Sequence, residues 1–377
     1  MANWDAVVIG LGGVGSAAAH HLAARGCRVL GLDQHPRGHT LGSSHGKTRI
    51  IRQAYFEHPS YVPLLCRAYQ LWQELELASG RQLYHPTGLV ELGPADGVVI
   101  PGVLRSAAEH ALAIEALSVD EVTRRWPGLA GPRLREHGGL RAVIEKDAGY
   151  LRVEDCVETH LQLAERAGAT LRHVRPVRHW RTNGQAVEVT TDEGIEHAAR
   201  LVIAGGPWSG RLLSSLGIPL RVLRKYQYWY QPKSPGYAQS DGFPCFFHET
   251  PSGYFYGFPD IGSEGLKVAR HSGGTAVESP TSPHPRDRDE QRRIEDYLNG
   301  YLPGVGDQLK TQTGCYYTTT PDEHFIVDLL PNARQVAVIA GLSGHGFKFT
   351  SVLGELASQL AIDGATTLDT SLLRIGR

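Results

Sequence analysis

Hydrophobic and polar residues follow two different periods along the chain, and the opening shows both. The apolar run 5–9 (DAVVI) predicts a buried strand, and a glycine-rich turn, 10–15, comes directly after it. The next expected elements are a helix over 16–25, which Gly26 terminates, and a strand over 28–33. A strand–helix–strand opening of this kind predicts a parallel sheet.

A similar pattern returns near the other end of the chain. The apolar run 336–340 (VAVIA) predicts a buried strand, which leads through glycines into a helix from about 348 to 361. Between the ends, residues 221–231 and 252–270 alternate aromatic and polar side chains, as antiparallel strands do. Other expected elements are helices over 61–79, 103–126 (mostly helical) and 153–167, and strands over 87–93, 170–175, 186–191 and 200–204. The chain is therefore expected to be α/β at both ends, with a more antiparallel middle inserted as a second domain.

Two polar stretches interrupt this pattern. Residues 36–48 (PRGHTLGSSHGKT) predict a Gly-rich loop. The Pro- and charge-rich residues 280–293 predict an exposed loop that enters a helix, and a partner-binding tail is the alternative interpretation.

Composition and charge exclude several classes of protein. The 377 residues carry a net charge of −1 and an ordinary share of apolar residues, so neither wholesale disorder nor a basic nucleic-acid-binding domain is expected. The five cysteines are odd in number and contain no CxxC pair, which is typical of a reduced, cytoplasmic protein and indicates no metal site. The uncharged stretch 6–24 has the length of a signal peptide, but it lacks a basic start and fits a dinucleotide-binding unit better. No membrane partner is expected.

The glycine turn carries the clearest chemical signal. Residues 10–15 (GLGGVG) fit the pattern G-x-G-x-x-G between a strand and a helix. In this pattern Gly10 permits the tight turn, Gly12 lets a pyrophosphate approach the backbone, and Gly15 lets the helix pack closely on the strand. Asp33, at the end of the second strand, can accept hydrogen bonds from ribose hydroxyls and disfavours the 2′-phosphate of NADP.

The fingerprint alone does not separate NAD from FAD. No second strand–helix–strand fingerprint follows within the next hundred residues, where an NAD-binding domain would usually continue. This arrangement favours FAD.

Three further segments offer groups to a ligand. Gly205 and Trp208 follow a predicted strand in LVIAGGPW, where a glycine pair permits close approach of a ligand or, alternatively, forms a tight packed turn. In LSGHGFKF (342–349), Lys348 opens a helix and could bind a carboxylate, unless it is a solvated surface lysine. Arg49 and Arg52 would share a face on a helical turn, and the arginine fork holds carboxylates; ordinary surface arginines are the alternative.

These segments together resemble one family, the monomeric sarcosine oxidases and N-methyl-tryptophan oxidases, which are FAD enzymes of the glycine-oxidase and D-amino-acid-oxidase fold group. The resemblance covers essentially the whole chain. The segments that carry it are SSHGKTRIIRQAY (43–55), YGFP (256–259), LKVARH (266–271), GCYYTTTPDEHFIVD (314–328) and SGHGFKF (343–349). TPDEHFIVD and SGHGFKFTSVLGE lean towards the N-methyl-tryptophan branch.

The resemblance implies a Rossmann-like FAD-binding domain with an inserted antiparallel-sheet substrate domain, an α/β fold that is α+β overall. The expected boundaries are 1–83, 146–219 and 322–377 for the FAD-binding domain and 84–145 and 220–321 for the substrate domain. Cys315 stands where the family attaches the 8α-methyl group of the flavin, so a covalent FAD is expected. As a lone cysteine it would otherwise be interpreted as a small buried hydrophobe.

The resemblance also implies roles for individual residues. Arg52 and Lys348 would bind the substrate carboxylate, and Lys267 would lie near flavin N5 and promote the reaction with O2, since a fixed cation stabilises superoxide. The remaining residues expected at the catalytic and substrate-binding site are Arg49 beside the flavin and Tyr254, His271 and Tyr317 around the substrate, with Tyr254 and His271 open to interpretation as plain core residues and His45 near the flavin as a weaker candidate. The residues assigned to the cofactor are Gly10, Gly12, Val14, Gly15, Asp33, Ser43, Thr48, Arg49, Val177, Gly205, Trp208, Cys315, Gly344, Gly346, Phe347 and Lys348.

The implied reaction is oxidation of a secondary amino acid, such as sarcosine or N-methyl-L-tryptophan, with O2 as acceptor and formaldehyde and H2O2 as products. A pipecolate-type cyclic imino acid oxidase, a flavin dehydrogenase that passes electrons to a partner, a non-catalytic flavin-binding protein and an NAD-dependent dehydrogenase are the alternatives. Lys47 and Gln53 depart from the family pattern, in which an acidic residue and a histidine are common, and they leave the substrate preference open. The family name suggests a monomer.

Overall fold

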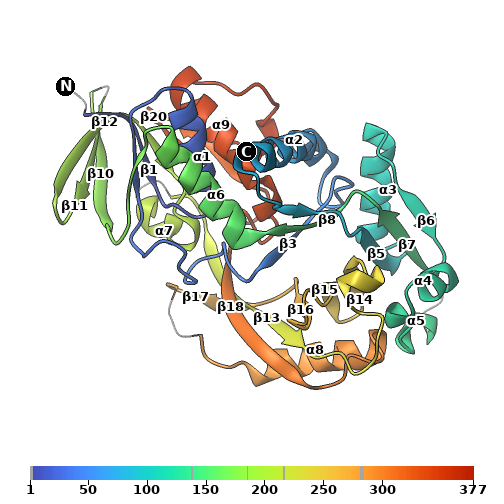
Figure 1. The fold of residues 1–377 in the computed structure, drawn as a ribbon. Coiled ribbons are helices and arrows are strands. Elements are labelled where there is room, and N and C mark those ends of the chain that lie inside the picture. The colour runs from blue at the N-terminus through green and yellow to red at the C-terminus, as the bar shows by residue number, and fades with distance from the viewer. Residues whose placement is uncertain (1–2, 137–138, 185, 215–216, 281–283) are drawn as a thin grey trace.

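A computed structural model describes residues 3–136, 139–184, 186–214, 217–280 and 284–377. Two large sheets dominate it, one at the upper left of Figure 1 and one that runs from its lower centre to its right-hand side. Segments from both ends of the chain meet in the first sheet, as the hydrophobic pattern predicts.

The first sheet has eight strands, with a parallel centre and antiparallel margins. Its strands are β1 (Trp4–Ile9), β2 (Val29–Leu32), β9 (Thr170–Arg172), β10 (Val177–Asn183), β11 (Ala186–Thr191), β12 (Gly194–Ile203), β19 (Ile326–Leu330) and β20 (Ala333–Ala340). β1 lies between β12 and β2 with parallel pairing on both sides, and β20 pairs parallel with β12. The strand β10, which forms a hairpin with β11, is a strand that the sequence pattern did not predict.

Three helices cover one face of this sheet, α1 (Gly13–Ala24), α6 (Val153–Arg166) and α9 (Thr350–Asp363) (Figure 1). A fourth helix, α2 (Val62–Ser79), packs on α6 and α9. Helix α1 packs against both α6 and α9, and the shared core is aliphatic. Gly80 terminates α2 with a φ of 69°, a left-handed conformation that glycine adopts without strain.

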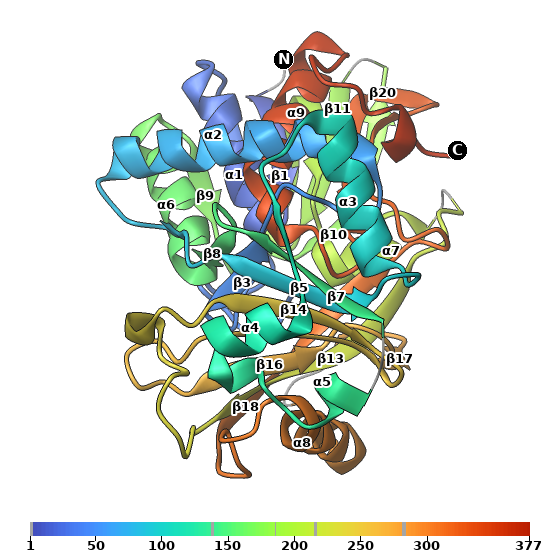
Figure 2. The same ribbon diagram turned by 90° about the vertical axis from the view of Figure 1, so that its right-hand side faces the viewer.

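The second sheet has nine strands and is mainly antiparallel. Its strands are β5 (Leu89–Pro94), β6 (Glu115–Leu117), β7 (Leu140–Glu145), β13 (Arg221–Tyr230), β14 (Cys245–Thr250), β15 (Gly253–Phe258), β16 (Leu266–Arg270), β17 (Thr275–Val277) and β18 (Leu309–Thr319). Helix α8 (Arg288–Tyr301) packs its apolar side on one face. The opposite face packs on α3 (Val99–His110) and on a small sheet of β3 (Thr48–Ile51), β4 (Tyr84–His85) and β8 (Gly149–Arg152). Figure 2 shows this small sheet above the larger one.

One expectation holds in outline and another is wrong. The segment 103–126 is mostly helical, as expected, but β6 separates α3 from the short α4 (Val119–Arg125), which starts at a Ser118 capping box. The arginines 49 and 52 do not share a helical turn, because Arg49 lies in β3 and Arg52 follows directly after it. Part of the stretch 280–293 lies outside the described residues, and α8 starts within it at Arg288. The described part of the chain also contains two short helices, α5 (Arg133–Glu136) and α7 (Ser209–Leu212).

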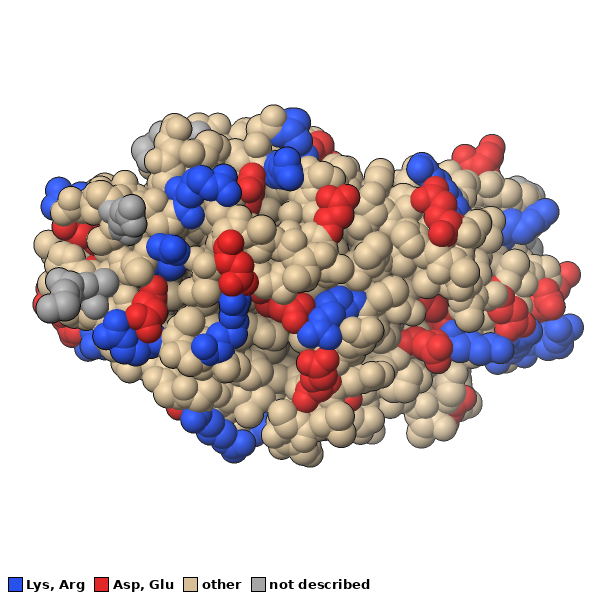
Figure 3. Space-filling model, turned by 90° about the horizontal axis from the view of Figure 1, so that it is seen from above, with Lys and Arg blue, Asp and Glu red and all other residues tan. Residues whose placement is uncertain are grey.

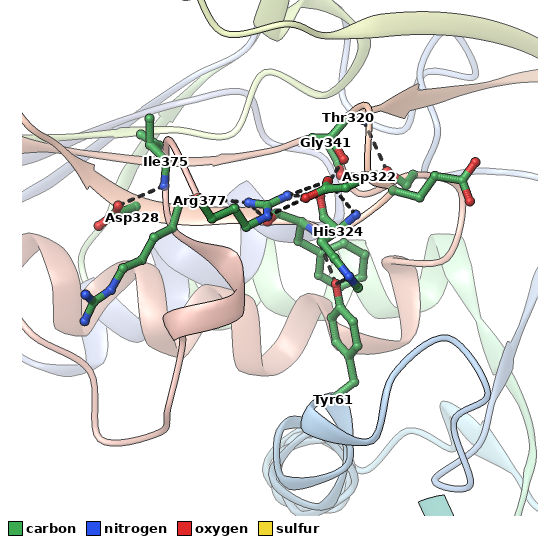
Figure 4. Close-up of polar contacts among 12 residues, drawn as sticks. Tyr61, Thr320, Asp322, His324, Asp328, Gly341, Ile375 and Arg377 are labelled. Carbon is green, nitrogen blue, oxygen red and sulfur yellow. Dashed lines mark hydrogen bonds and ion pairs between the residues drawn. The ribbon is translucent and has the colours of Figure 1, made fainter. Parts of the chain in front are cut away.

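The C-terminal residues attach to the segment between β18 and β19 (Figure 4). The guanidinium of Arg377 binds both carboxylate oxygens of Asp322, each at 2.8 Å, and also the backbone oxygen of His324 at 2.9 Å. The imidazole of His324 lies 3.2 Å from the hydroxyl of Tyr61, at the start of α2. The tail is thereby fastened to the segment between β18 and β19, which itself contacts the start of α2 through His324.

Acidic and basic side chains are interspersed on the face shown in Figure 3, with no extended area of one sign there. Of the helices in the described part of the chain, none combines the length and the apolar character needed to cross a bilayer. Likewise, no three His, Cys, Asp or Glu side chains in the described ranges are grouped so that they could hold a metal ion.

Candidate functional site

The glycine turn joins β1 to α1 with no room for side chains at two of its positions. Gly10 has a φ of +89°. A Cβ on Gly15 would lie 1.7 Å from the backbone oxygen of Gly10, so α1 can approach β1 only with glycine there. At Gly12 the nearest atom to such a Cβ is the Ser44 hydroxyl oxygen, at 3.4 Å, so this backbone faces open space. The turn has the form that a dinucleotide pyrophosphate requires.

Asp33 lies at the carboxyl end of β2 and is fixed by backbone donors. One carboxylate oxygen accepts a hydrogen bond from the Leu11 N–H at 2.7 Å, and the other accepts from the His35 N–H at 2.8 Å. A carboxylate can accept about four hydrogen bonds, so capacity remains for ribose hydroxyls. The imidazole of His39 lies 3.8 Å from the carboxylate.

A cavity of about 440 Å³ connects these groups. The cofactor residues expected from the sequence that line it are Gly10, Gly12, Val14, Asp33, Ser43, Arg49, Val177, Gly205, Trp208, Gly344, Gly346 and Phe347, and Tyr317 lines it as well. The walls combine a glycine turn at a helix N-terminus, a carboxylate after β2 and apolar side chains such as Ile9 and Leu212, which fit the phosphates, the ribose and the ring systems of FAD.

Four expected cofactor residues lie outside the lining of this cavity: Gly15, Thr48, Cys315 and Lys348. Gly15 serves the packing of α1 on β1, as described above. The other three are buried, and each adjoins in sequence a residue that lines the cavity.

Arg49 extends from β3 into the cavity wall and is held by backbone oxygens. Its guanidinium donates to the Ser43 and Thr48 backbone oxygens, both at 2.9 Å, and lies 3.4 Å from the amide oxygen of Gln227. The Ser43 hydroxyl in turn donates to the Tyr316 backbone oxygen at 2.6 Å. The loop before β3 is thus fastened to β18.

Lys267, on β16, is a buried cation behind this loop. Its ammonium donates to the Gly46 and Thr48 backbone oxygens at 2.6 and 2.8 Å and lies 3.1 Å from the Thr48 hydroxyl. The ammonium also lies 4.7 Å from the centre of the Phe258 ring. Burial, together with the charge of Arg49, holds the lysine pKa well below its usual value. Burial likewise lowers the pKa of His45 to about 4, so this imidazole is neutral near pH 7.

Arg52 is buried at the end of β3 and has two carboxylates as neighbours. Its guanidinium lies 2.7 Å from Glu57 and 3.6 Å from Glu91, and it stacks on the ring of Phe56 at 4.5 Å. Burial opposes ionisation of Glu57, but the charges of Arg52, His345 and Lys348 together outweigh it and lower the pKa of Glu57 to about 2. Because successive side chains of a strand point to opposite faces, Arg49 and Arg52 reach different sides of β3.

Lys348 precedes α9, in the 3₁₀ turn Phe347–Phe349, and is buried rather than solvated. Its ammonium donates to the His345 backbone oxygen at 2.8 Å. The ammonium lies 5.2 Å from the centre of the Tyr55 ring, and the Arg52 guanidinium lies 4.8 Å from the same centre. Burial and the charge of Arg52 lower the pKa of Lys348 to about 7. Two cations from distant parts of the chain therefore meet at one aromatic ring.

The expected substrate residues are brought together only in part. The hydroxyl of Tyr317 lies 3.4 Å from His271, and the Tyr256 and Tyr317 hydroxyls are hydrogen-bonded to each other. The ring of Tyr254 instead packs between the rings of Phe247 and Phe56. Tyr256 lies on the same face of β15 as Tyr254, within the aromatic segment 254–258, but the sequence motifs singled out only Tyr254.

Glu57 and Glu91 were also missed. Glu57 gives no pattern in the sequence beyond its closeness to Arg52. Glu91 does give one, because it is a lone carboxylate in the otherwise apolar strand GLVELGP (88–94). A charged residue at such a position is rarely buried without a partner.

Cys315 lies in β18 directly opposite Lys225 of β13. The Lys225 ammonium donates to three successive backbone oxygens, those of His271, Ser272 and Gly273, at 2.8–3.0 Å. This contact fastens the turn after β16, in which His271 lies. The cysteine is buried, and its neighbours Tyr316 and Tyr317 line the cavity.

The two departures from the family pattern lie apart from these groups. The Lys47 ammonium pairs with Glu264 at 3.0 Å at the surface. The side-chain amide of Gln53 contacts the sulfur of Cys66 at 3.5 Å, and the backbone N–H of Gln53 donates a hydrogen bond to the Glu145 carboxylate.

Comparisons with known proteins agree with this geometry. The family model described as "FAD dependent oxidoreductase" matches residues 5–360. Monomeric sarcosine oxidase of Streptomyces avermitilis is 42% identical over 97% of this chain and 95% of that protein. N-methyl-L-tryptophan oxidase of Salmonella typhimurium is 37% identical over 100% of this chain and 99% of that protein.

Solved structures show the same fold. The open form of NikD, described as an unusual amino acid oxidase essential for nikkomycin biosynthesis, superposes with a TM-score of 0.85 at 26% identity and covers 99% of this chain and 98% of its own. Glycine oxidase from Geobacillus kaustophilus reaches a TM-score of 0.81 at 20% identity, covering 99% and 98%, which shows the fold alone. The expected Rossmann-like domain with a second, largely antiparallel sheet is confirmed. The chain therefore belongs to the FAD-dependent oxidoreductases, and the residues around its cavity fit the cofactor that names the family.

Proposed function

We propose that this enzyme oxidises the C–N bond of a secondary amino acid such as sarcosine or N-methyl-L-tryptophan. The observation that carries the proposal is the meeting of Arg52 and Lys348 at the ring of Tyr55, behind a cavity that fits FAD. Two buried cations at one point suit the carboxylate that every such substrate contains. The names of the curated relatives support the same substrate class.

The overall reaction balances with water and oxygen as co-substrates. An N-methyl amino acid, O2 and H2O give the primary amino acid, formaldehyde and H2O2. FAD, which the glycine turn, Asp33 and Arg49 would hold, would supply the two-electron acceptor between the amine and O2. Everything else in the reaction depends on how the protein positions the amine and on which charges it provides.

Arg52 and Lys348 fix the substrate by its carboxylate and so hold its amine at one place. His271 is neutral near pH 7, since burial lowers its pKa to about 3, and it contacts the hydroxyl of Tyr317, which lines the cavity. A neutral imidazole leaves the substrate amine without a competing positive charge. Lys267 provides the fixed cation that favours reduction of O2, and its place behind Gly46 and Thr48 keeps it away from the carboxylate.

The FAD is covalently attached through Cys315 in this proposal, and the enzyme works as a cytoplasmic monomer. The division into an FAD-binding domain (1–83, 146–219 and 322–377) and a substrate domain (84–145 and 220–321) stays a prediction, supported by the two large sheets.

Anaerobic titration of the holoenzyme tests the proposal. Sarcosine, N-methyl-L-tryptophan and L-pipecolate are added separately while the visible spectrum is followed. Bleaching by an N-methyl amino acid, with stoichiometric H2O2 on readmission of air, is expected. Bleaching by L-pipecolate alone would identify a cyclic imino acid oxidase, bleaching without H2O2 a dehydrogenase, and no bleaching by any of the three would contradict the proposal. Arg52→Met serves as the control, which should bleach only at much higher substrate concentration.

A further inference from the structure

Glu91 is a buried carboxyl group for which the proposed reaction has no use. It lies in β5, between Phe247 of β14 and Val143 of β7, and its exposed fraction is 1%. Neither of its oxygens has a hydrogen-bond partner among the residues that the structure describes. Most buried carboxylates accept several hydrogen bonds, so this carboxyl group needs an explanation.

Within the described ranges, Arg52 is the only ion-pair partner of Glu91. The Glu91 carboxyl lies 3.6 Å from the guanidinium, which is an ion-pair distance but too long for a hydrogen bond. The Nε atom of Arg52 also has no partner among the described residues. Arg52 thus has one firm partner, Glu57 at 2.7 Å, and one loose partner, Glu91.

The charges around Glu91 already balance without it. Those that act on it are the cations Arg52, after β3, and Lys348, before α9, and the carboxylates Glu57, in the loop after Arg52, and Glu145, in β7. Glu145 has its own donors, the N–H groups of Gln53 and Ala54 at 2.7 and 2.8 Å. When all four groups are charged, their net charge is zero. An ionised Glu91 makes it negative, and a substrate carboxylate adds a further negative charge in a buried, weakly screened place.

We propose that Glu91 is a positioning residue of the carboxylate clamp, the pair of cations Arg52 and Lys348. Glu91 takes up a proton when a carboxylate binds to Arg52 and thereby leaves the charge of the arginine to the ligand. The inference rests on the carboxylate clamp of the proposed function. A protonated Glu91 keeps its place beside Arg52 without competing for its charge. An ionised Glu91 competes for that charge and weakens carboxylate binding.

The linkage has a definite direction with pH. Burial, opposed by the charge of Arg52, raises the pKa of Glu91 to about 8, so that the carboxyl group is mostly protonated at neutral pH. As the pH rises through this value, Glu91 ionises in the free enzyme and must regain its proton when a carboxylate binds. The affinity for a carboxylate therefore falls with pH, by about tenfold between pH 7 and pH 9 through this group.

Acetate is the probe, because it carries a carboxylate and no amine of its own to titrate. Its binding to the holoenzyme is followed by the change in the visible spectrum between pH 6 and 9.5. Calorimetry at pH 9, in buffers of different ionisation enthalpy, gives the number of protons taken up. Two variants are compared with the wild type. Glu91→Gln resembles the protonated form, and Glu249→Gln is a control on the same face of the sheet. The Glu249 carboxylate accepts hydrogen bonds from the Val98 and Val99 N–H groups at 2.8–3.0 Å.

Glu91→Gln should take up about one proton fewer per acetate than the wild type at pH 9 and should lose about tenfold less affinity between pH 7 and 9. Glu249→Gln should match the wild type in both. Equal proton uptake in Glu91→Gln and wild type would overturn the inference. Should Glu91→Gln not fold, Lys348→Arg gives the answer, because it removes the lysine titration: about one proton taken up at pH 9 supports the role of Glu91, and none overturns it.

The outcomes separate this inference from the proposed function. Acetate that binds without proton linkage, in an enzyme that N-methyl amino acids bleach, overturns the role of Glu91 alone. Proton-linked acetate binding in an enzyme that no secondary amino acid bleaches overturns only the substrate class. Acetate binding that persists unchanged in Arg52→Met, or no acetate binding at any pH, overturns the clamp and with it the role of Glu91.

Discussion

The carboxylate of Glu57 lies 2.7 Å from the guanidinium of Arg52, so the arginine expected to bind the substrate is already paired within the protein. The Arg52 side chain is buried and that of Glu57 is 17% exposed, and the cations around Glu57 together outweigh the cost of removing its carboxylate from water. A substrate carboxylate must therefore compete with Glu57 or share Arg52 with it. Breaking or sharing this internal pair costs free energy, which lowers the affinity of the clamp for a substrate carboxylate.

Removing the internal competitor should strengthen carboxylate binding. In Glu57→Gln the affinity for acetate is expected to rise about tenfold, because a charge-assisted hydrogen bond worth about 1.5 kcal/mol no longer has to be exchanged. The titration of the visible spectrum measures it. Unchanged affinity would contradict the competition.

The same variant has a predicted effect on stability. The folded-state pKa of Glu57 is lowered from 4.5 to about 2, so the pair stabilises the fold above pH 4.5 and its contribution is lost as the pH falls towards 2. Thermal unfolding between pH 7 and 3 should therefore show a steeper acid loss in the wild type than in Glu57→Gln. At pH 7 the variant should be the less stable of the two, since Arg52 loses its firm partner.

Lys348 should impose a second pH dependence on carboxylate binding. Its pKa is lowered to about 7, so the ammonium is charged below this pH and loses its proton as the pH rises through it. Acetate affinity should decline across pH 7 in the wild type. Lys348→Arg, which keeps its charge, should lack this step, and Lys348→Met should bind acetate weakly at every pH. The fall near pH 8 assigned to Glu91 should remain in Lys348→Arg, whereas a step near pH 7 that persists in this variant would contradict the role of Lys348.

Lys267 should affect the reaction with oxygen and leave the reaction with substrate intact. In Lys267→Met we expect flavin reduction by substrate at the wild-type rate and reoxidation slower by about a hundredfold. Stopped-flow measurement of the two half-reactions separates them. Because burial lowers the lysine pKa, wild-type reoxidation should also slow as the pH rises, whereas the variant should show no such slope. Unchanged reoxidation in the variant would contradict the role of Lys267.

The attachment of the flavin is tested by acid precipitation. Yellow colour is expected to remain with the redissolved pellet of the wild type and to wash into the supernatant with Cys315→Ser. Cys245→Ser is the matched control, since Cys245 is equally buried in a strand of the same sheet. Loss of colour from the wild-type pellet would contradict the covalent attachment and would not bear on the FAD-binding fold.

The glycine turn allows a paired test of packing and cofactor binding. Gly15→Ala should fail to fold or to hold FAD, because its Cβ would overlap the Gly10 backbone oxygen. Gly12→Ala should fold, since its Cβ meets nothing closer than 3.4 Å, but should bind FAD more weakly by narrowing the approach to the backbone. FAD content and circular dichroism of the two variants distinguish these effects. Equal FAD content in Gly12→Ala and wild type would contradict the close approach.

The sequence by itself determined the features that depend on neighbouring residues. The apolar run of β1, the glycine turn and α1 follow each other within a few residues, so their order alone predicts the parallel unit and the place of Asp33. The same holds for Gly80 at the end of α2 and for the alternation in β13 and β15. Local sterics and the period of burial decide these features, and both are visible in a short stretch of sequence.

Only the tertiary structure decided which charges meet. Arg52, Glu57, Glu91 and Lys348 come from the end of one strand, a loop, a strand of another sheet and the turn before the last long helix, and no local period links them. The helical spacing suggested for Arg49 and Arg52 was wrong because pairing with β8 makes this segment a strand. Electrostatic interactions in a buried site depend on distances through space and on exclusion of water, which the fold sets and the linear order does not contain.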